Sequence, residues 1–205
     1  PLLVALVVAM SFFYPSTLPS LPPGFFTPVL AMEFVTSQAD AQAIFAGDLE
    51  LVQRTQTGHL IDMAFALAYG AFLALANLGC WYWQRRLVNL AGVLLAVLAA
   101  AADCVENLQL LRLGDVLLGQ AAAPDFGLLR ICVSIKFASI ALSMLCLVPS
   151  LWPHGWPGKG FSLVSILLVP VALTALALAN RPDTHPLLEA VAILMGPGWI
   201  LLLVW

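Results

Sequence analysis

The sequence predicts an all-α integral membrane protein, a polytopic transmembrane helical bundle of about six spans in which five is the alternative number. Composition is the first reason: 62% of the 205 residues are hydrophobic and only 9% are charged, whereas soluble domains carry roughly 25% charged residues. The second is length, since a span needs about 20 mostly apolar residues. Five stretches reach or approach that length: 56–79, 87–112, 125–148, 162–180 and 187–205. Because the links between them are short, we expect one integral membrane domain over 1–205, with a five-helix core over 56–205.

The residues before this core are divided by prolines. Residues 1–14 are the expected first span, which is short, as a truncated helix would be. Four prolines between residues 15 and 23 then prevent a helix from continuing. Residues 25–35 are apolar but too short to span, so they are predicted to be a re-entrant or interfacial piece. Residues 15–55 as a whole are therefore expected to form a proline-rich loop and a surface helix.

Residues 36–54 are the only stretch that resembles the helices of soluble proteins. Ser37, with Asp40 three residues later, is placed to cap the start of a helix, and Gly47 is expected to end it. The apolar residues that would share one face of this helix are Ala41, Ile44 and Phe45. We therefore expect the helix to lie on the membrane surface or on the bundle.

The links between the predicted spans are expected to be turns at the membrane surface. They are a tight turn over 80–86, a half-turn over 114–125, a loop rich in proline, glycine and tryptophan over 149–160, and a minimal hairpin over 180–186. Tryptophans in and beside these links mark the two membrane interfaces. Pro170 and the Gly-Pro-Gly run at 196–198 are expected to kink or break the last two spans.

Charged residues in the links suggest an orientation. We call side A the side that the chain reaches after the first span, and side B the other. The loop acids all fall on side A: Asp40, Asp48, Glu50, Asp115, Asp125 and Asp183. Basic residues are almost evenly divided, but Arg85 and Arg86 lie directly beside two spans on side B. We therefore expect side B to be cytoplasmic, in a bacterial inner membrane or an equivalent internal membrane.

Ionisable residues inside the predicted spans gather in the half of the bilayer nearest side A. At 1.5 Å per residue, Asp62 and Glu106 would lie roughly 9 Å deep and Asp103 roughly 13 Å deep. Lys136 would lie roughly 16 Å deep, and Glu189 comes a few residues into the last span. Because one charge at the bilayer centre costs roughly 3 kcal/mol or more, these side chains are expected to face the interior of the bundle.

Their spacing predicts a candidate site. Asp103, Glu106 and Asn107 are i, i+3 and i+4, so they share one helix face. The site candidates are Asp62, Asp103, Glu106, Asn107 and Lys136, and the secondary candidates are Glu33, His59, Arg130 and Glu189. Lys136 is expected to neutralise one carboxylate. Three interpretations stay open: a salt-bridge network that fixes helix register, a ligand or ion site, and catalysis by an acid that holds its proton.

Cofactor and nucleic-acid sites are not predicted. The four cysteines are scattered through apolar stretches without a C-x-x-C pair, and no metal-binding or nucleotide-binding motif occurs, so we expect no metal site. His59 and His185 each begin a span, and ligation of a haem or a pigment by either is a weaker alternative to an interfacial histidine. A net charge of −3 without basic patches gives no sign of nucleic-acid binding.

Four short motifs carry a resemblance. Glu33 in "AMEF", Asp62 in "IDMAFALAY", the stretch "DCVENLQLLR" and Lys136 in "IKFA" together resemble small uncharacterised polytopic membrane proteins of bacteria. The resemblance covers roughly residues 28–140. It implies a helical bundle and no particular activity.

The absence of a soluble domain and of a catalytic motif favours a non-enzymatic accessory or scaffold subunit of a membrane complex. Its expected partners are the lipid bilayer and other membrane subunits. The first alternative is a transporter or carrier of protons, small cations or a lipophilic ligand, which requires a water-filled cavity. The second alternative is a membrane enzyme that acts on a lipid-like substrate.

Overall fold

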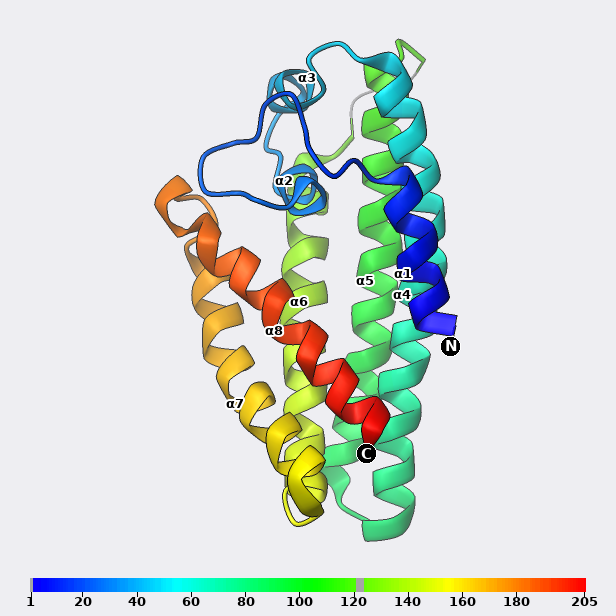
Figure 1. Ribbon diagram of the computed structural model, residues 1–205, viewed down its shortest axis with the longest axis vertical. Helices are drawn as coiled ribbons and strands as arrows, with labels where there is room; N and C mark the ends of the chain where they lie inside the picture. Colours follow the sequence, from blue (N-terminus) through cyan, green and yellow to red (C-terminus); the bar gives the residue numbers. More distant parts are fainter. Residues whose placement is uncertain (1, 121–123) are drawn as a thin grey trace. The chain divides into compact units, whose positions relative to one another are not determined.

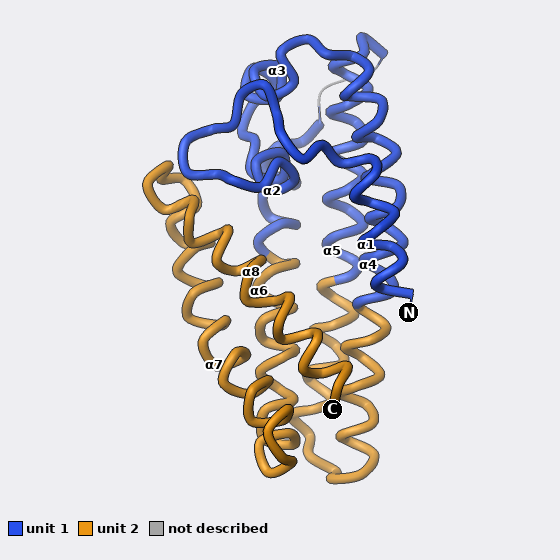
Figure 2. The backbone as a smooth tube through the Cα atoms, in the orientation of Figure 1, with its two compact units in different colours: residues 1–69, 100–134 blue, residues 70–99, 135–205 orange. Residues whose placement is uncertain are grey.

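The computed structural model describes residues 2–120 and 124–205, and these residues form helices and links without a strand (Figure 1). The chain divides into two compact units (Figure 2). Unit 1 comprises residues 1–69 and 100–134, and unit 2 comprises residues 70–99 and 135–205. The single domain expected over 1–205 stays a prediction.

Five described helices are long and apolar enough to cross a membrane, which confirms the predicted fold class. They are α4 (Leu49–Gln84), α5 (Leu87–Leu117), α6 (Phe126–Leu151), α7 (Gly155–Ala177) and α8 (His185–Val204). The expected first span is α1 (Leu2–Phe13), which has 12 residues, all apolar except Ser11. At 1.5 Å per residue α1 is about 18 Å long, shorter than the roughly 30 Å hydrocarbon core. The chain therefore has the helices of a multi-pass membrane protein.

The segment between α1 and α4 forms two short helices, as the sequence predicts. Helix α2 (Pro28–Glu33) is too short to span, and α3 (Gln38–Phe45) begins at the expected cap, where Ser37 Oγ accepts a hydrogen bond from the Asp40 amide at 3.1 Å. Asp40 Oδ2 in turn accepts from the Thr36 hydroxyl at 2.7 Å. This hydrogen bond holds the pKa of the Asp40 carboxyl below its usual value. Helix α3 ends before Gly47, whose φ of 79° is left-handed.

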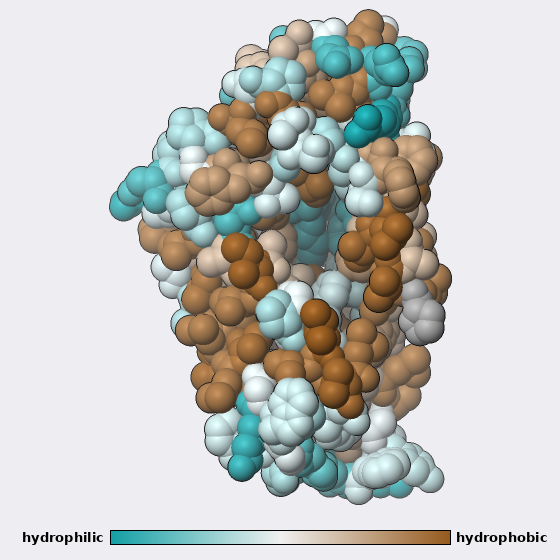
Figure 3. Space-filling model, viewed as in Figure 1, coloured by the Kyte–Doolittle hydropathy of each residue, from teal (hydrophilic) through white to brown (hydrophobic). Residues whose placement is uncertain are grey.

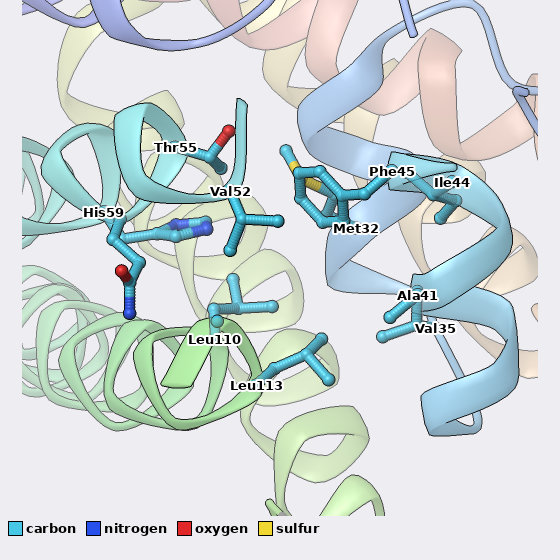
Figure 4. A pocket seen from close by; sticks show the side chains of 12 residues that line it. Met32, Val35, Ala41, Ile44, Phe45, Val52, Thr55, His59, Leu110 and Leu113 are labelled. Carbon is cyan, nitrogen blue, oxygen red and sulfur yellow. The ribbon is translucent and has the colours of Figure 1, made fainter. Parts of the chain in front are cut away.

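Helix α3 packs against the long helices of unit 1. Its apolar face is buried, with Ala41 and Ile44 both 1% exposed and Phe45 5% exposed. These residues line a small cavity together with Val52 of α4 and with Leu110 and Leu113 of α5 (Figure 4). The apolar face thus covers the ends of two long helices within unit 1.

Two predicted links are shorter than expected because the helices continue into them. Helix α4 runs to Gln84, so the turn over 80–86 is reduced to Arg85, with a φ of 55°, and Arg86. Helix α6 continues through Pro149 and α7 begins at Gly155, so the loop over 149–160 is reduced to residues 152–154. Pro157 is tolerated because it lies in the first turn of α7, where the backbone N–H has no intrahelical partner.

The other two links are also partly helical. Helix α5 continues to Leu117, so only the end of the half-turn expected over 114–125 is non-helical, and its residues 121–123 lie outside the described residues. The hairpin over 180–186 contains a 3₁₀ turn, η1 (Pro182–Thr184). Neither α7 at Pro170 nor α8 at Pro197 is interrupted, so the expected helix breaks do not occur.

Unit 2 has a polar contact between helices in its core. Asn77 on α4 is fully buried, and its Nδ2 donates to the backbone oxygens of Leu73 at 3.0 Å and Ser143 at 3.3 Å. The Ser143 hydroxyl donates to the Gly92 oxygen at 2.9 Å. These bonds connect α4, α5 and α6, which is the usual role of asparagine and serine between transmembrane helices.

The outward faces of the long helices are apolar. Figure 3 shows apolar side chains on the outward faces of α7 and α8, where Leu173 is 49% exposed and Ile193 is 69% exposed. Leu67 on α4 and Leu94 on α5 are 62% and 72% exposed. A surface of this kind is stable in lipid and unfavourable in water.

Candidate functional site

A cluster of hydrogen-bonded polar side chains lies inside unit 1. We call it the polar cluster, and its members are Tyr14, His59, Asp62, Tyr69, Asp103 and Asn107. Tyr14 directly follows α1, the next three residues lie on α4, and the last two lie on α5. The cluster therefore joins three segments that are distant in the sequence.

Asn107 is the centre of the polar cluster. It is 0% exposed, and its Nδ2 donates to Asp103 Oδ1 at 3.0 Å on the same helix and to Asp62 Oδ2 at 3.3 Å on α4. Its Oδ1 lies 3.2 Å from His59 Nδ1. One amide group therefore contacts two carboxylates and one imidazole.

The His59 imidazole lies between an amide and a hydroxyl. The Asn107 nitrogen faces the carboxylates, so its oxygen, which only accepts, faces His59. Tyr14 Oη lies 2.8 Å from His59 Nδ1, and the Tyr14 hydroxyl donates to Asp62 Oδ2 at 3.4 Å. Tyr14 and Asn107 thus contact the same imidazole nitrogen.

Tyr69 on α4 is another hydrogen-bond partner of Asp103. The Tyr69 hydroxyl donates to Asp103 Oδ2 at 2.9 Å, while Asn107 donates to Oδ1. Both side chains are buried, with Tyr69 1% exposed and Asp103 3% exposed. Hydrogen bonds to both carboxylate oxygens offset part of the cost of removing this group from water.

Tyr14 can reach the cluster because α4 has a glycine beside it. A Cβ on Gly58 would lie 3.0 Å from Tyr14 Cε1, so a larger residue would push the ring away. The Tyr14 and His59 rings meet edge to face with centroids 5.3 Å apart. Arg54 Nε also donates to the Phe13 oxygen at 3.1 Å, which fixes the end of α1 against α4.

The structure brings four of the predicted site residues together: Asp62, Asp103 and Asn107 of the principal set and His59 of the secondary set. The other two predicted acids in unit 1, Glu106 on α5 and Glu33 on α2, are 0% and 5% exposed. Arg130 is half-buried on α6, in the same unit. The site is thus built from the face of α5 that the spacing predicts.

The remaining two candidates belong to unit 2. Lys136 is 5% exposed, and its ammonium lies 4.8 Å from the centroid of the Phe137 ring, a cation–π contact. Glu189 is 3% exposed near the start of α8. The neutralisation of a carboxylate by Lys136 stays a prediction.

Two members of the polar cluster were not among the predicted residues. Tyr69 follows Asp62 by seven residues, which places both on one face of α4, so helical periodicity was a usable signal. Tyr14 lies in a non-helical link and has no periodic relation to the other members. Only the folded chain places it beside His59.

A cavity of about 10 Å³ lies beside the polar cluster. Figure 4 shows His59 and Val52 on α4 facing Met32 and Phe45 across it. Space for a single water molecule begins at roughly 10–15 Å³. This cavity has room for at most one water and none for an organic substrate.

Metal or haem ligation gains no support in the described residues, where no three His, Cys, Asp or Glu side chains meet as metal ligands would. His59 Nδ1 is engaged by Tyr14 and Asn107. His185 begins α8 in unit 2. Ligation by either histidine stays a prediction.

Comparisons with known proteins found no matching family model, no matching curated protein and no matching solved structure. The resemblance to small membrane proteins of bacteria therefore stays a prediction.

Proposed function

We propose that this chain is a non-enzymatic accessory or scaffold subunit of a membrane complex, in which the polar cluster holds the helices of unit 1 in register. The observation that carries the proposal is the position of Asn107. Its amide is shared among Asp62, Asp103 and His59, so the polar groups are directed at one another rather than at an open cavity.

The energetics support a structural role. A carboxylate buried in a membrane protein is expensive unless it is hydrogen-bonded. Hydrogen bonds between transmembrane helices contribute about 0.6 kcal/mol on average and up to about 2 kcal/mol each. The bonds from Asn107 to Asp62 and from Tyr69 to Asp103 both connect α4 with α5. Several such bonds are enough to select one arrangement of the two helices over its alternatives.

The small cavity supports the same conclusion. A carrier of an organic ligand, or an enzyme acting on a lipid, would need a chamber next to the ionisable groups. Ligand sites usually enclose roughly 300–1,000 Å³, whereas the cavity at His59 has about 10 Å³. The volume favours a network that holds helices together over a site that binds a substrate.

The apolar outer faces provide the surface that a subunit needs. On α1, Leu2 and Phe12 are 64% and 71% exposed, and on α8 Ile193 is 69% exposed. Among transmembrane helices, lateral association depends on packing between such faces. We propose that one of these faces contacts another membrane subunit and that the others contact lipid.

Proton carriage is the second candidate, and the composition of the polar cluster favours it. Tyr14, His59 and Asp62 are ionisable and hydrogen-bonded in series, and groups of this kind transfer protons in pumps and transporters. Asn107 lies between this series and Asp103, and an amide is not among the His, acidic, Lys, Tyr or Cys side chains that transfer protons. An amide at the centre of the polar cluster favours the structural role of the two.

Extraction in native lipid tests the proposal. We expect the tagged wild-type chain and an Asn107→Leu variant to differ: the wild type should retain a second membrane polypeptide in fixed ratio, and the variant should lose most of it. Leu108→Ala is the matched control, because Leu108 is 46% exposed on the same helix, and it should behave as the wild type. Recovery of the wild-type chain alone would overturn the proposal.

A further inference from the structure

Unit 2 contains a groove that the polar cluster and the proposed scaffold role do not use. It has a volume of about 520 Å³, within the range of ligand-binding sites. Its lining residues are Leu75, Ala76, Gly79, Cys80, Trp83, Gln84, His154 and Trp205. We call it the α4 groove, because the first six of these residues lie on the last turns of α4.

The walls of the α4 groove are mostly apolar, and their polar members include Gln84, which ends α4, and His154, which lies in the link before α7. Cys80 is 4% exposed, whereas Leu75 and Trp83 are 66% and 85% exposed and form exposed parts of the lining. His154 and Trp205 meet edge to face with centroids 6.2 Å apart. An apolar slot with tryptophans and an imidazole matches a ligand that has a long apolar chain and a polar head.

The charge at this end of unit 2 is positive. Arg85 and Arg86 directly follow the groove residues of α4, and Lys159 lies in the first turns of α7, five residues after His154. The Arg85 guanidinium stacks over the Trp81 ring with its carbon 4.9 Å from the centroid. Positive groups beside an apolar slot attract an anionic headgroup.

The sequence on either side of these cations has no acidic residue. The sequence has no Asp or Glu between Asp62 and Asp103, and none between Asp125 and Asp183. Within unit 2 the nearest acid along α8 is Glu189, which is 16 residues before Trp205 and therefore about 24 Å away along the helix. The cations near the groove thus have no competing carboxylate beside them in the sequence.

We infer that the α4 groove binds one acyl chain of an anionic glycerophospholipid, with the phosphate at Arg85 and Arg86. The bilayer supplies this ligand, and its two parts match the two features of the site. The inference is independent of the scaffold role, because it depends on unit 2 alone and involves no residue of the polar cluster.

Glycine substitutions allow the groove to be filled selectively. A Cβ on Gly79 would meet no atom within 4 Å, so Gly79→Leu places its side chain in the open groove without a clash at Cβ. Gly196 on α8 has equally open surroundings and does not line the groove. Gly196→Leu is therefore the matched control, because it makes the same glycine-to-leucine change in unit 2 but outside the groove.

The test is a titration of the detergent-purified chain with dioleoyl phosphatidylglycerol or dioleoyl phosphatidylcholine, read by native mass spectrometry. We expect one phosphatidylglycerol to bind the wild type and Gly196→Leu about tenfold more tightly than phosphatidylcholine, since two nearby cations favour an anionic head. Gly79→Leu should lose about tenfold in affinity for both lipids. The double variant Arg85→Gln, Arg86→Gln should bind both lipids equally.

Two results would overturn the inference. One is equal binding of the two lipids by the wild type. The other is phosphatidylglycerol binding by Gly79→Leu that matches that of Gly196→Leu. The arginine variants lie outside the groove lining, so their loss of headgroup preference can be measured even if Gly79→Leu does not fold.

Discussion

Replacing Asn107 by leucine is expected to lower the free energy of unfolding by about 2 to 4 kcal/mol. The substitution keeps the side-chain size similar but removes the amide that contacts His59, Asp62 and Asp103. The two carboxylates then lose a donor, and for the buried Asp103 water does not replace it, which costs more than the bond itself. Reversible unfolding of the purified chain in mixed detergent micelles measures the change.

Leu108→Ala is the control for this measurement. Leu108 is the next residue of α5 and is 46% exposed, so its truncation should change the free energy of unfolding by less than about 0.5 kcal/mol. If Asn107→Leu were no more destabilising than Leu108→Ala, the polar cluster would not be holding α4 and α5 together.

Replacing Gly92 by alanine is expected to cost about 2 kcal/mol, because the new methyl group would overlap the Asn77 side chain. That side chain cannot easily move, since its Nδ2 is bonded to the oxygens of Leu73 and Ser143. The same unfolding experiment applies. Gly79→Ala on α4 is the matched control, and it should be neutral or slightly stabilising, because its Cβ has open space and alanine favours a helix.

A double-mutant cycle identifies the cause of the Gly92 effect. Truncation of Asn77 to alanine removes the atoms that the new methyl group would meet, so the double variant should be destabilised by less than the sum of the two single changes. Strict additivity would show that Gly92 matters for a reason other than its contact with Asn77.

Local rules of sequence predict much of this fold. The lengths of the apolar stretches predict the five long helices, and the Ser37 cap and the break at Gly47 are found where their residue types indicate. The links are less well predicted. Helix α6 continues through Pro149, because the loss of one backbone hydrogen bond near a helix end is small against the burial that extends the helix.

The sequence predicts only part of the candidate site. Spacing alone places Asp103 and Asn107 on one face of α5, and depth alone places Asp62 beside them. Which groups then bond to one another depends on the rotation of each helix and on the path of the proline-rich link, as Tyr14 demonstrates. The spacing of residues along one helix determines neither the rotation of that helix against its neighbours nor the path of the link.

Proton flux across reconstituted vesicles distinguishes the structural role of the polar cluster from proton carriage most directly. The vesicles hold the wild-type chain and a pH-sensitive dye. An imposed membrane potential drives protons across the bilayer, and the dye reports the rate of proton flux. If the role is structural, vesicles with the wild-type chain and vesicles with Asp103→Asn should both show the same proton flux as vesicles without protein. A wild-type flux well above that background, abolished in an Asp103→Asn chain that remains folded, would contradict it.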